Sequence, residues 1–152
     1  MSNQNKSSIK AYSKGKQWTW RTLNVAWSEE FAKINSPPAI LLIHGFGACK
    51  GHWRHNQKVL GEYSDCYAID LIGFGESSQP NAQLKDEANN SQKFIYCFDN
   101  WAEQINDFCQ EVINKPVILI GNSIGGVIAL RAAQILKEKC QRVVLIDCSQ
   151  RT

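Results

Sequence analysis

The sequence predicts an α/β fold with a mostly parallel sheet and helices on both faces. Apolar segments of strand length alternate with segments of helical periodicity, which is the pattern of a parallel sheet joined by right-handed crossovers. The runs at 39–43 and 117–120 are continuously apolar, as expected for strands that are covered on both faces. The chain has 152 residues, 43% hydrophobic and 20% charged, so a single globular domain is expected.

The first half of the chain is expected to hold strands, a short helix and a long loop. Alternating apolar residues between Trp18 and Trp27 predict two short antiparallel strands. Apolar spacing over 52–60 predicts a short helix, and 66–72 predicts a strand that runs into a glycine turn. Residues 78–97 are polar and therefore predict a long loop, which in a compact domain is usually functional or mobile.

The second half is expected to hold two helices and a last strand. Asn100 and Glu103 have the spacing of a capping box, which predicts the start of a helix at this point. That helix would bury an apolar stripe formed by Trp101, Ile105, Phe108 and Val112. A second helix is expected over 124–139 and a strand within 142–147.

Charge and hydropathy exclude several classes of function. The net charge of +3 is spread along the chain without a basic stripe, so no nucleic-acid partner is expected. No run approaches the roughly 20 apolar residues of a membrane span, and the first residues lack the apolar core of a secretory signal. A cytoplasmic location is expected, with the six cysteines as reduced thiols. Those cysteines form no C-x-x-C pair, and neither a metal nor a cofactor is expected.

The segment with the strongest chemical signal runs from Gly121 to Gly125. Gly121-Asn122-Ser123-Ile124-Gly125 matches G-x-S-x-G between a buried strand and an apolar helix, the context of a nucleophile elbow. Glycine at both ends would allow the strand and the helix to approach closely. The unpaired N–H of Ile124 at the helix start would stabilise an oxyanion above the Ser123 hydroxyl.

Two further segments follow predicted strands. His44-Gly45-Phe46-Gly47 comes directly after the strand at 39–43. The segment from Asp70 to Ser77 has the pattern D-x-x-G-x-G-x-S, and Asp70 is expected to be a satisfied, buried or turn-binding carboxylate rather than a catalytic acid.

Together these segments resemble the α/β-hydrolase superfamily with a serine nucleophile. The resemblance covers about residues 17–149, and within the superfamily the chain is similar to cyanobacterial and chloroplast hydrolases related to pheophytinase and chlorophyll dephytylase. It implies a serine hydrolase acting on a small-molecule carboxylic ester or related acyl bond, including bulky or prenyl esters. Haloalkane dehalogenases, epoxide hydrolases and carbon–carbon bond hydrolases have similar N-terminal halves. The first two use an aspartate nucleophile, so Ser123 argues against both of these.

The resemblance also implies roles for individual residues. The backbone N–H of Phe46 would be the second oxyanion-hole donor beside that of Ile124. The residues that would support the elbow and the loop are His44, Gly45, Gly47, Gly121, Asn122 and Gly125. The family's triad runs Ser, then Asp or Glu, then His along the chain, and Asp147 is a candidate for the acid.

No histidine follows Ser123 in this sequence. The three histidines, His44, His52 and His55, all precede it, where the family does not place its general base. Residues 17–152 are therefore expected to be the N-terminal half of an α/β-hydrolase domain, truncated after about the sixth strand. Residues 1–16 are polar with spaced lysines and are expected to form a disordered leader. Little or no activity of the chain alone is expected, and an apolar edge strand would favour self-association or pairing with a missing C-terminal half.

Two alternative functions are open at this stage. A non-catalytic remnant, a split subunit or a binding module that retains the hydrolase fold would explain the absent histidine directly. A nucleotide-binding oxidoreductase is disfavoured, because the glycines at 45, 47 and 51 depart from G-x-G-x-x-G.

Overall fold

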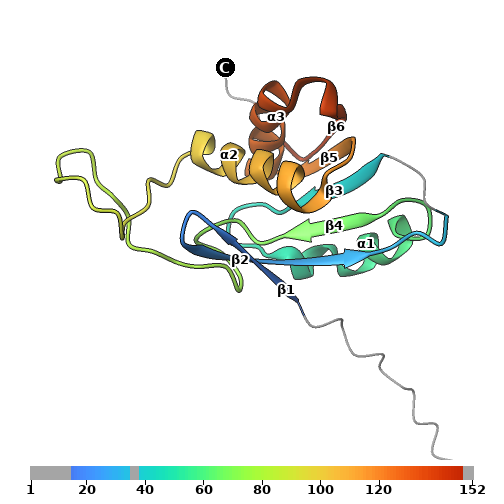
Figure 1. The fold of residues 1–152 in the computed structure, drawn as a ribbon, viewed down its shortest axis with the longest axis horizontal. Coiled ribbons are helices and arrows are strands. Elements are labelled where there is room, and N and C mark those ends of the chain that lie inside the picture. Colours follow the sequence, from blue (N-terminus) through green and yellow to red (C-terminus); the bar gives the residue numbers. More distant parts are fainter. Residues whose placement is uncertain (1–14, 35–37, 149–152) are drawn as a thin grey trace, which may run out of the picture.

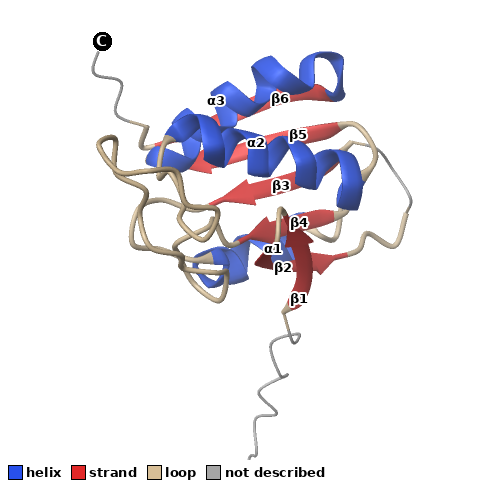
Figure 2. Cartoon of the chain, turned by 60° about the vertical axis from the view of Figure 1, so that its left-hand side comes forward, coloured by secondary structure: helices blue, strands red, loops and turns tan. Residues whose placement is uncertain are grey.

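The computed structural model describes residues 15–34 and 38–148, which form one six-stranded sheet with helices on both faces. The strand order is β1-β2-β4-β3-β5-β6, with β4, β3, β5 and β6 parallel and the β1–β2 and β2–β4 pairs antiparallel (Figure 2). The strands are β1 (Lys16–Trp20), β2 (Leu23–Glu30), β3 (Ala39–Ile43), β4 (Cys66–Ile69), β5 (Val117–Asn122) and β6 (Cys140–Ile146). The predicted mostly parallel α/β sheet is confirmed.

Helices cover the two faces of the sheet unequally (Figure 1). One face carries the short α1 (Arg54–Leu60), which continues from a 3-10 turn, η1 (Lys50–Trp53). The other face carries α2 (Phe98–Phe108) and α3 (Ile124–Leu136). A π-helical turn, Cys109–Ile113, follows α2, and a 3-10 turn, Lys137–Lys139, follows α3.

The main core lies between the sheet and the pair α2 and α3. Phe108, Leu119 and Ile128 are fully buried there, and the rings of Trp18, Trp27 and Tyr67 pack edge-on against Phe108. Alternate residues of β5, Ile118 and Ile120, face a smaller cluster on the α1 side and are only half-buried. The α1 side of the sheet is thus less completely covered near β5 and β6.

The sheet ends at β6 among the described residues, and that edge is apolar. Val144, Leu145 and Ile146 are each between 41% and 43% exposed. Their exposure contrasts with the central strand β3, in which every residue is buried. β6 is therefore a hydrophobic edge strand, and such strands readily pair with strands of other chains.

Two predicted boundaries are wrong for tertiary reasons. The strand expected over 66–72 ends at Ile69, because the next backbone N–H groups are used elsewhere: that of Leu71 donates to His44 Nε2 and that of Ile72 to Gln104 Oε1. The capping box at Asn100 and Glu103 is absent. The helix begins earlier, at Phe98, and Glu103 instead pairs with Arg21 at the β1–β2 turn.

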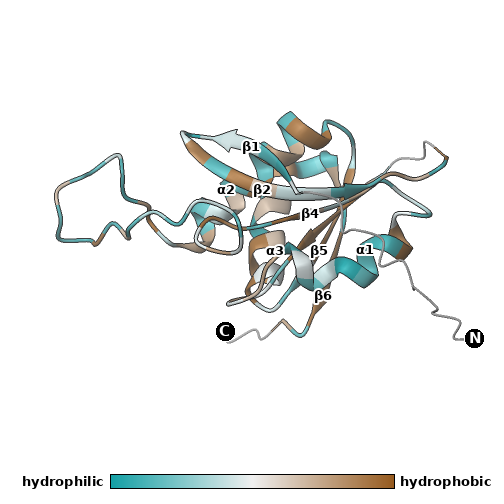
Figure 3. Ribbon diagram, turned by 90° about the horizontal axis from the view of Figure 1, so that it is seen from below, coloured by the Kyte–Doolittle hydropathy of each residue, from teal (hydrophilic) through white to brown (hydrophobic). Residues whose placement is uncertain are grey.

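The segment after β4 forms the long polar loop that the sequence predicts. It projects from the body of the molecule, and its residues are mostly hydrophilic (Figure 3). The expected leader lies almost wholly outside the described residues, since β1 begins at Lys16 and residues 1–14 are not described. Of the helices in residues 15–34 and 38–148, none has the length and apolar character to cross a bilayer.

His44 links the end of β3 to the segment that follows β4. The ring is almost fully buried, its Nε2 accepts the Leu71 N–H at 3.0 Å, and its Nδ1 donates to the Gly45 carbonyl at 2.8 Å. Both nitrogens have partners only in the neutral tautomer that carries its proton on Nδ1. Burial lowers the pKa of His44 and outweighs the hydrogen bond to Gly45 and the charge of Asp70, which raise it.

Because the pKa of His44 is lower in the folded than in the unfolded chain, we expect stability to fall on acidification. The contribution is fully present above the ordinary histidine value of 6.5, and it is lost as the pH drops below 6.5 towards the folded-state pKa. His44→Asn should lower the free energy of unfolding by about 1–3 kcal/mol at pH 7.5, since the buried Leu71 N–H loses its acceptor. It should also abolish most of the pH dependence just below pH 6.5, above the range in which carboxylates titrate, measured by urea unfolding at a series of pH values.

His55→Asn is the matched control, because His55 is exposed on α1. That variant should keep both the stability and the pH dependence of the wild type. Equal pH dependence in His44→Asn and the wild type would contradict the role given to His44.

Candidate active site

Ser123 occupies a sharp turn between β5 and α3. Its backbone has φ 54° and ψ −121°, a conformation that residues with a side chain rarely adopt. Two backbone hydrogen bonds hold the turn: the Ser123 N–H donates to the Ile146 carbonyl, and the Gly126 N–H donates to the Ser123 carbonyl, both at 3.0 Å. The strain therefore sits at the residue that the sequence marks as nucleophile, and the local geometry is that of a strand-to-helix elbow.

The glycines at 121 and 125 leave room for this turn. A Cβ on Gly121 would overlap the carbonyl group of Gly125, and one on Gly125 would lie 2.5 Å from the carbonyl oxygen of His44 and overlap that of Ile43. The elbow of α3 thus contacts the backbone of β3 directly, which a side chain at either position would prevent. The close approach of strand and helix expected from the sequence is present.

The loop after β3 lies against Ser123. A Cβ on Gly45 would be 3.2 Å from the Cβ of Ser123 and 3.8 Å from its Oγ. Gly47 has φ +70° with open space around it, so the backbone conformation rather than crowding favours glycine there. Between the two glycines, Phe46 is 77% exposed, and its ring packs edge-on against that of Phe74 at 5.6 Å.

Two backbone N–H groups in the chain segments that meet at Ser123 have no backbone acceptor among the described residues. The N–H of Ile124 belongs to the first residue of α3 and so has no partner within the helix. For the N–H of Phe46, no backbone acceptor is found within residues 15–34 and 38–148. Gly45 and Asn122, the residues before Phe46 and Ser123, line a common cavity, so the two chain segments meet at one site.

That cavity has a volume of about 340 Å³ and opens on the α1 side of the sheet. It contains both apolar and polar side chains. The lining residues are His44, Gly45, Ala48, His52, Trp53, Asn56, Asn122 and Ile146. The hollow therefore joins the loop after β3 to the ends of β5 and β6.

The upstream histidines are not arranged as a general base for Ser123. Both nitrogens of His44 are occupied, as described above. His52 lines the cavity, but its Nδ1 accepts the Cys49 N–H at 3.2 Å, so the neutral ring carries its proton on Nε2 and has no free lone pair. His55 lies exposed on α1.

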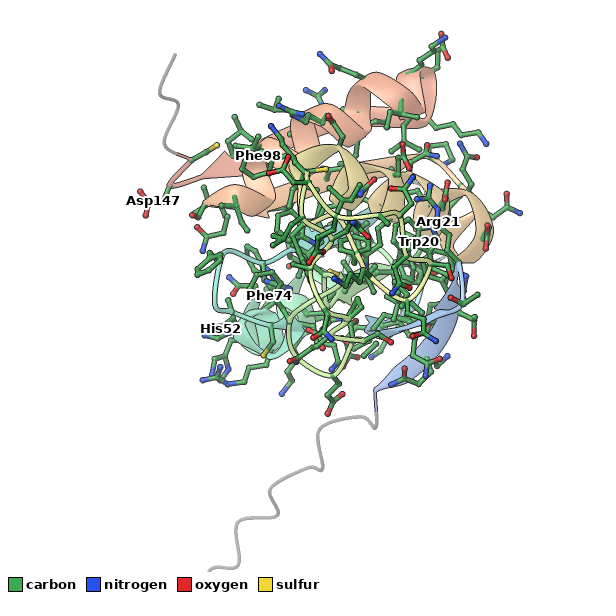
Figure 4. All side chains as sticks on the ribbon, turned by 90° about the vertical axis from the view of Figure 1, so that its left-hand side faces the viewer. Trp20, Arg21, His52, Phe74, Phe98 and Asp147 are labelled. Carbon is green, nitrogen blue, oxygen red and sulfur yellow. The ribbon has the colours of Figure 1, made fainter. Side chains whose placement is uncertain are left out.

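Asp147 follows β6 with a positive φ of 46°. Its side chain is exposed, and in Figure 4 the carboxylate points away from the body of the molecule, while His52 and Phe74 lie on a different part of this face. No side-chain hydrogen bond or ion pair of Asp147 occurs within the described part of the chain. The structure thus does not bring Asp147 into contact with the other candidate residues.

Asp70 is a buried, fully satisfied carboxylate, as the sequence analysis expected, but its cationic partner was missed. Lys50 pairs with Asp70 from the start of η1. The only signal in the sequence is a lysine within a segment, GFGACKGHW, that has no other charged residue at neutral pH, and nothing local indicates that its ammonium group turns inward.

Comparison with known proteins identifies the family. The family described as alpha/beta hydrolase fold matches residues 38–150. Chloroplastic pheophytinase of Arabidopsis thaliana is 28% identical over 131 residues, which cover 74% of this chain and 27% of that protein. A 1-acylglycerol-3-phosphate O-acyltransferase of Arabidopsis thaliana is 30% identical over 111 residues, covering 72% of this chain and 24% of that protein.

A solved structure shares the fold. The crystal structure of a membrane phospholipase A, described as a bacterial virulence factor, has a TM-score of 0.75 and 31% identity, and the match covers 91% of this chain and 41% of that chain. This chain spans about a quarter of the length of the two plant relatives. Since the family matches most of the sequence and the same fold is found in a solved hydrolase, the chain belongs to the α/β-hydrolase fold family.

Proposed function

We propose that the chain carries the nucleophile and the oxyanion hole of a serine hydrolase for carboxylic esters or related acyl bonds. Ser123 Oγ would attack the acyl carbon, and the N–H groups of Phe46 and Ile124 would stabilise the oxyanion. The observation that carries the proposal is the strained backbone of Ser123 directly beside Gly45. A serine that merely capped a helix would not need this conformation.

The base is proposed to come from outside the described residues. A serine hydroxyl without an activating histidine is a weak nucleophile, and loss of that histidine typically costs about 10⁶ in rate. Little or no turnover by this chain alone is therefore expected. A non-catalytic remnant, a split subunit or a binding module is the alternative, and the occupied nitrogens of His44 and His52 favour it as long as no base is supplied.

A bulky apolar ester is the proposed substrate class. The relatives named above include a pheophytinase, an acyltransferase of 1-acylglycerol-3-phosphate and a phospholipase. In this chain the exposed ring of Phe46 and its neighbour Phe74 provide apolar surface beside Ser123. A long acyl or prenyl chain could gain contact area there, whereas a small polar ester could not.

The β6 edge is the proposed contact surface, either for self-association or for a polypeptide that supplies the rest of a hydrolase domain. Its exposed Val144, Leu145 and Ile146 follow one another on the outermost strand. The cavity that ends at Ile146 extends this surface towards Asn122, next to the nucleophile. A polypeptide bound along β6 would thus also reach the site that lacks a base.

Free imidazole should restore hydrolysis if Ser123 is the nucleophile. We expect the imidazole-dependent hydrolysis of p-nitrophenyl butyrate by the wild type to exceed that of Ser123→Ala by about tenfold or more, below the roughly 10²- to 10⁴-fold of a positioned base. The measurement is the initial rate against imidazole concentration, corrected for imidazole without protein. Ser64→Ala, in the turn before β4, should match the wild type.

Identical imidazole-dependent rates in the wild type and Ser123→Ala would reject the nucleophile and leave the non-catalytic alternative. Hydrolysis without imidazole that disappears in Ser123→Ala would instead reject the proposed need for an external base.

A charge on the β6 edge should reduce association of the chain. We expect sedimentation velocity of the wild type to show species larger than the monomer that grow with concentration, and Val144→Lys to shift the distribution towards the monomer. Val59→Lys places the same charge on an exposed position of α1 and should leave the distribution unchanged. A wild type that stays monomeric at all concentrations and melts cooperatively would speak against the edge as a contact surface.

A further inference from the structure

A buried carboxylate lies beneath the loop that carries Phe46. Asp70 follows β4 directly and is 0% exposed. Its Oδ1 accepts the backbone N–H of Lys50 at 2.6 Å, and its Oδ2 accepts the Lys50 ammonium at 3.1 Å and the backbone N–H of Glu76 at 2.9 Å. A Cβ on Gly75 would overlap this carboxylate, so the surrounding backbone closes tightly around it.

Lys50 is the cation of this cluster. It is 6% exposed, and its ammonium also lies 2.7 Å from Glu76 Oε2, which reaches out to solvent. Burial lowers the pKa of Lys50, but the hydrogen bond that its ammonium donates to Glu76 and the charge of Asp70 outweigh burial and raise it. The same ammonium lowers the pKa of Glu76. Lys50 is thus charged and paired with both carboxylates.

The loop between β3 and η1 is anchored at both ends on one segment. At its start, His44 accepts the N–H of Leu71, and at its end Lys50 bonds the carboxylate of Asp70, the neighbouring residue. Between these anchors the backbone makes few hydrogen bonds in the described residues: the Ala48 N–H donates to the Gly45 carbonyl at 3.2 Å, the Cys49 N–H donates to His52 Nδ1 at 3.2 Å, and the Cys49 carbonyl accepts the His52 N–H at 3.0 Å. Phe46 itself is mostly exposed, so its backbone is positioned by the two anchors rather than by packing of its ring.

We propose that Lys50 is a positioning residue, which holds the loop Gly45–Cys49 against Asp70 so that the Phe46 N–H stays directed at the space beside Ser123. The role of that N–H rests on the proposed function. The anchoring itself does not, because it concerns the loop alone. Lys50 touches no reacting atom and acts through the loop.

Lys50 binds Asp70 in two ways, through its backbone N–H and through its side-chain ammonium. The backbone N–H fixes where η1 begins, while the ammonium neutralises the carboxylate that receives this N–H. Without the ammonium, the buried Asp70 carboxylate would have only backbone N–H donors to stabilise its charge. Opening of the loop would then be favoured, because water could solvate this charge. The opening would occur at the Lys50 end of the loop, while the anchor at His44 stays in place.

Hydrogen exchange of individual amides tests this proposal on the chain as it is. In Lys50→Met, which keeps the length of the side chain and removes the charge, we expect the hydrogen-bonded amides of residues 48–50 to exchange about tenfold faster or more than in the wild type. The amides of β5 serve as an internal reference and should change much less. Lys50→Arg retains the charge and should restore most of the protection of the loop.

Lys93→Met is the matched control, because it breaks an ion pair between Lys93 and Glu87 within the exposed loop. It should leave exchange at residues 48–50 unchanged. If Lys50→Met does not fold, Lys50→Gln, which keeps a hydrogen-bond donor to Asp70, replaces it and should accelerate exchange at residues 48–50 ahead of β5. Equal acceleration of the loop and β5, or no acceleration of the loop, would overturn the proposal.

The anchoring role of Lys50 and the nucleophilic role of Ser123 can fail independently in these experiments. Selective opening of the loop with no imidazole-dependent difference between the wild type and Ser123→Ala would support Lys50 as an anchor and reject the serine hydrolase. A Ser123-dependent rate that persists in Lys50→Met despite selective loop opening would reject the directing role of Lys50 while the serine hydrolase stands.

Discussion

The close contact between β3, β5 and the start of α3 is the constraint on which the rest of the site depends. β3 and β5 pair in parallel with Ile43 opposite Gly121, so the loops that follow the two strands begin at the same end of the sheet. Because Gly121 and Gly125 have no Cβ, α3 can begin directly against the backbone of Ile43 and His44. The positive φ of Ser123 and its contact with Gly45 are consequences of this packing.

The other contacts around the site fix the loop that this packing brings to Ser123. A neutral, buried His44 and a charged, buried Lys50 both bind the short segment after β4, one through its backbone and one through its carboxylate. The segment is itself bonded to the rest of the fold, since the Asp70 carbonyl accepts the Ser77 hydroxyl and the Gln104 amide. The loop is thus held by the centre of the sheet and by α2, rather than by the exposed β6.

Much of the fold could be predicted because it depends on local patterns. Continuous apolar runs indicated β3 and β5, and the spacing of Trp101, Ile105 and Phe108 indicated the buried face of α2. The predicted end of β4 and start of α2 were wrong because groups distant in the sequence determine them. Nothing near Leu71 in the sequence reveals that its N–H bonds a histidine 27 residues earlier, and nothing near Glu103 reveals Arg21.

The site divides in the same way. G-x-S-x-G carries its own geometry, because strand, turn and helix are consecutive in the chain, so the elbow could be predicted in detail. The buried position of Lys50 could not be predicted, because a lysine in a loop usually points to solvent. Its ammonium turns inward only because of the buried Asp70, 20 residues later. An acid or a base that acts on Ser123 would also come from a distant part of the sequence, so the role of Asp147 after β6 stays a prediction.

The backbone of Ser123 has a consequence for selection on this position. A glycine would adopt the same φ and ψ without the strain of about 1–3 kcal/mol that a residue with a Cβ suffers there, but it would have no hydroxyl. Folding by itself would thus favour an inert residue at the sharpest point of the turn. In the proposed function, the hydroxyl of Ser123 supplies reactivity at the expense of this conformational stability.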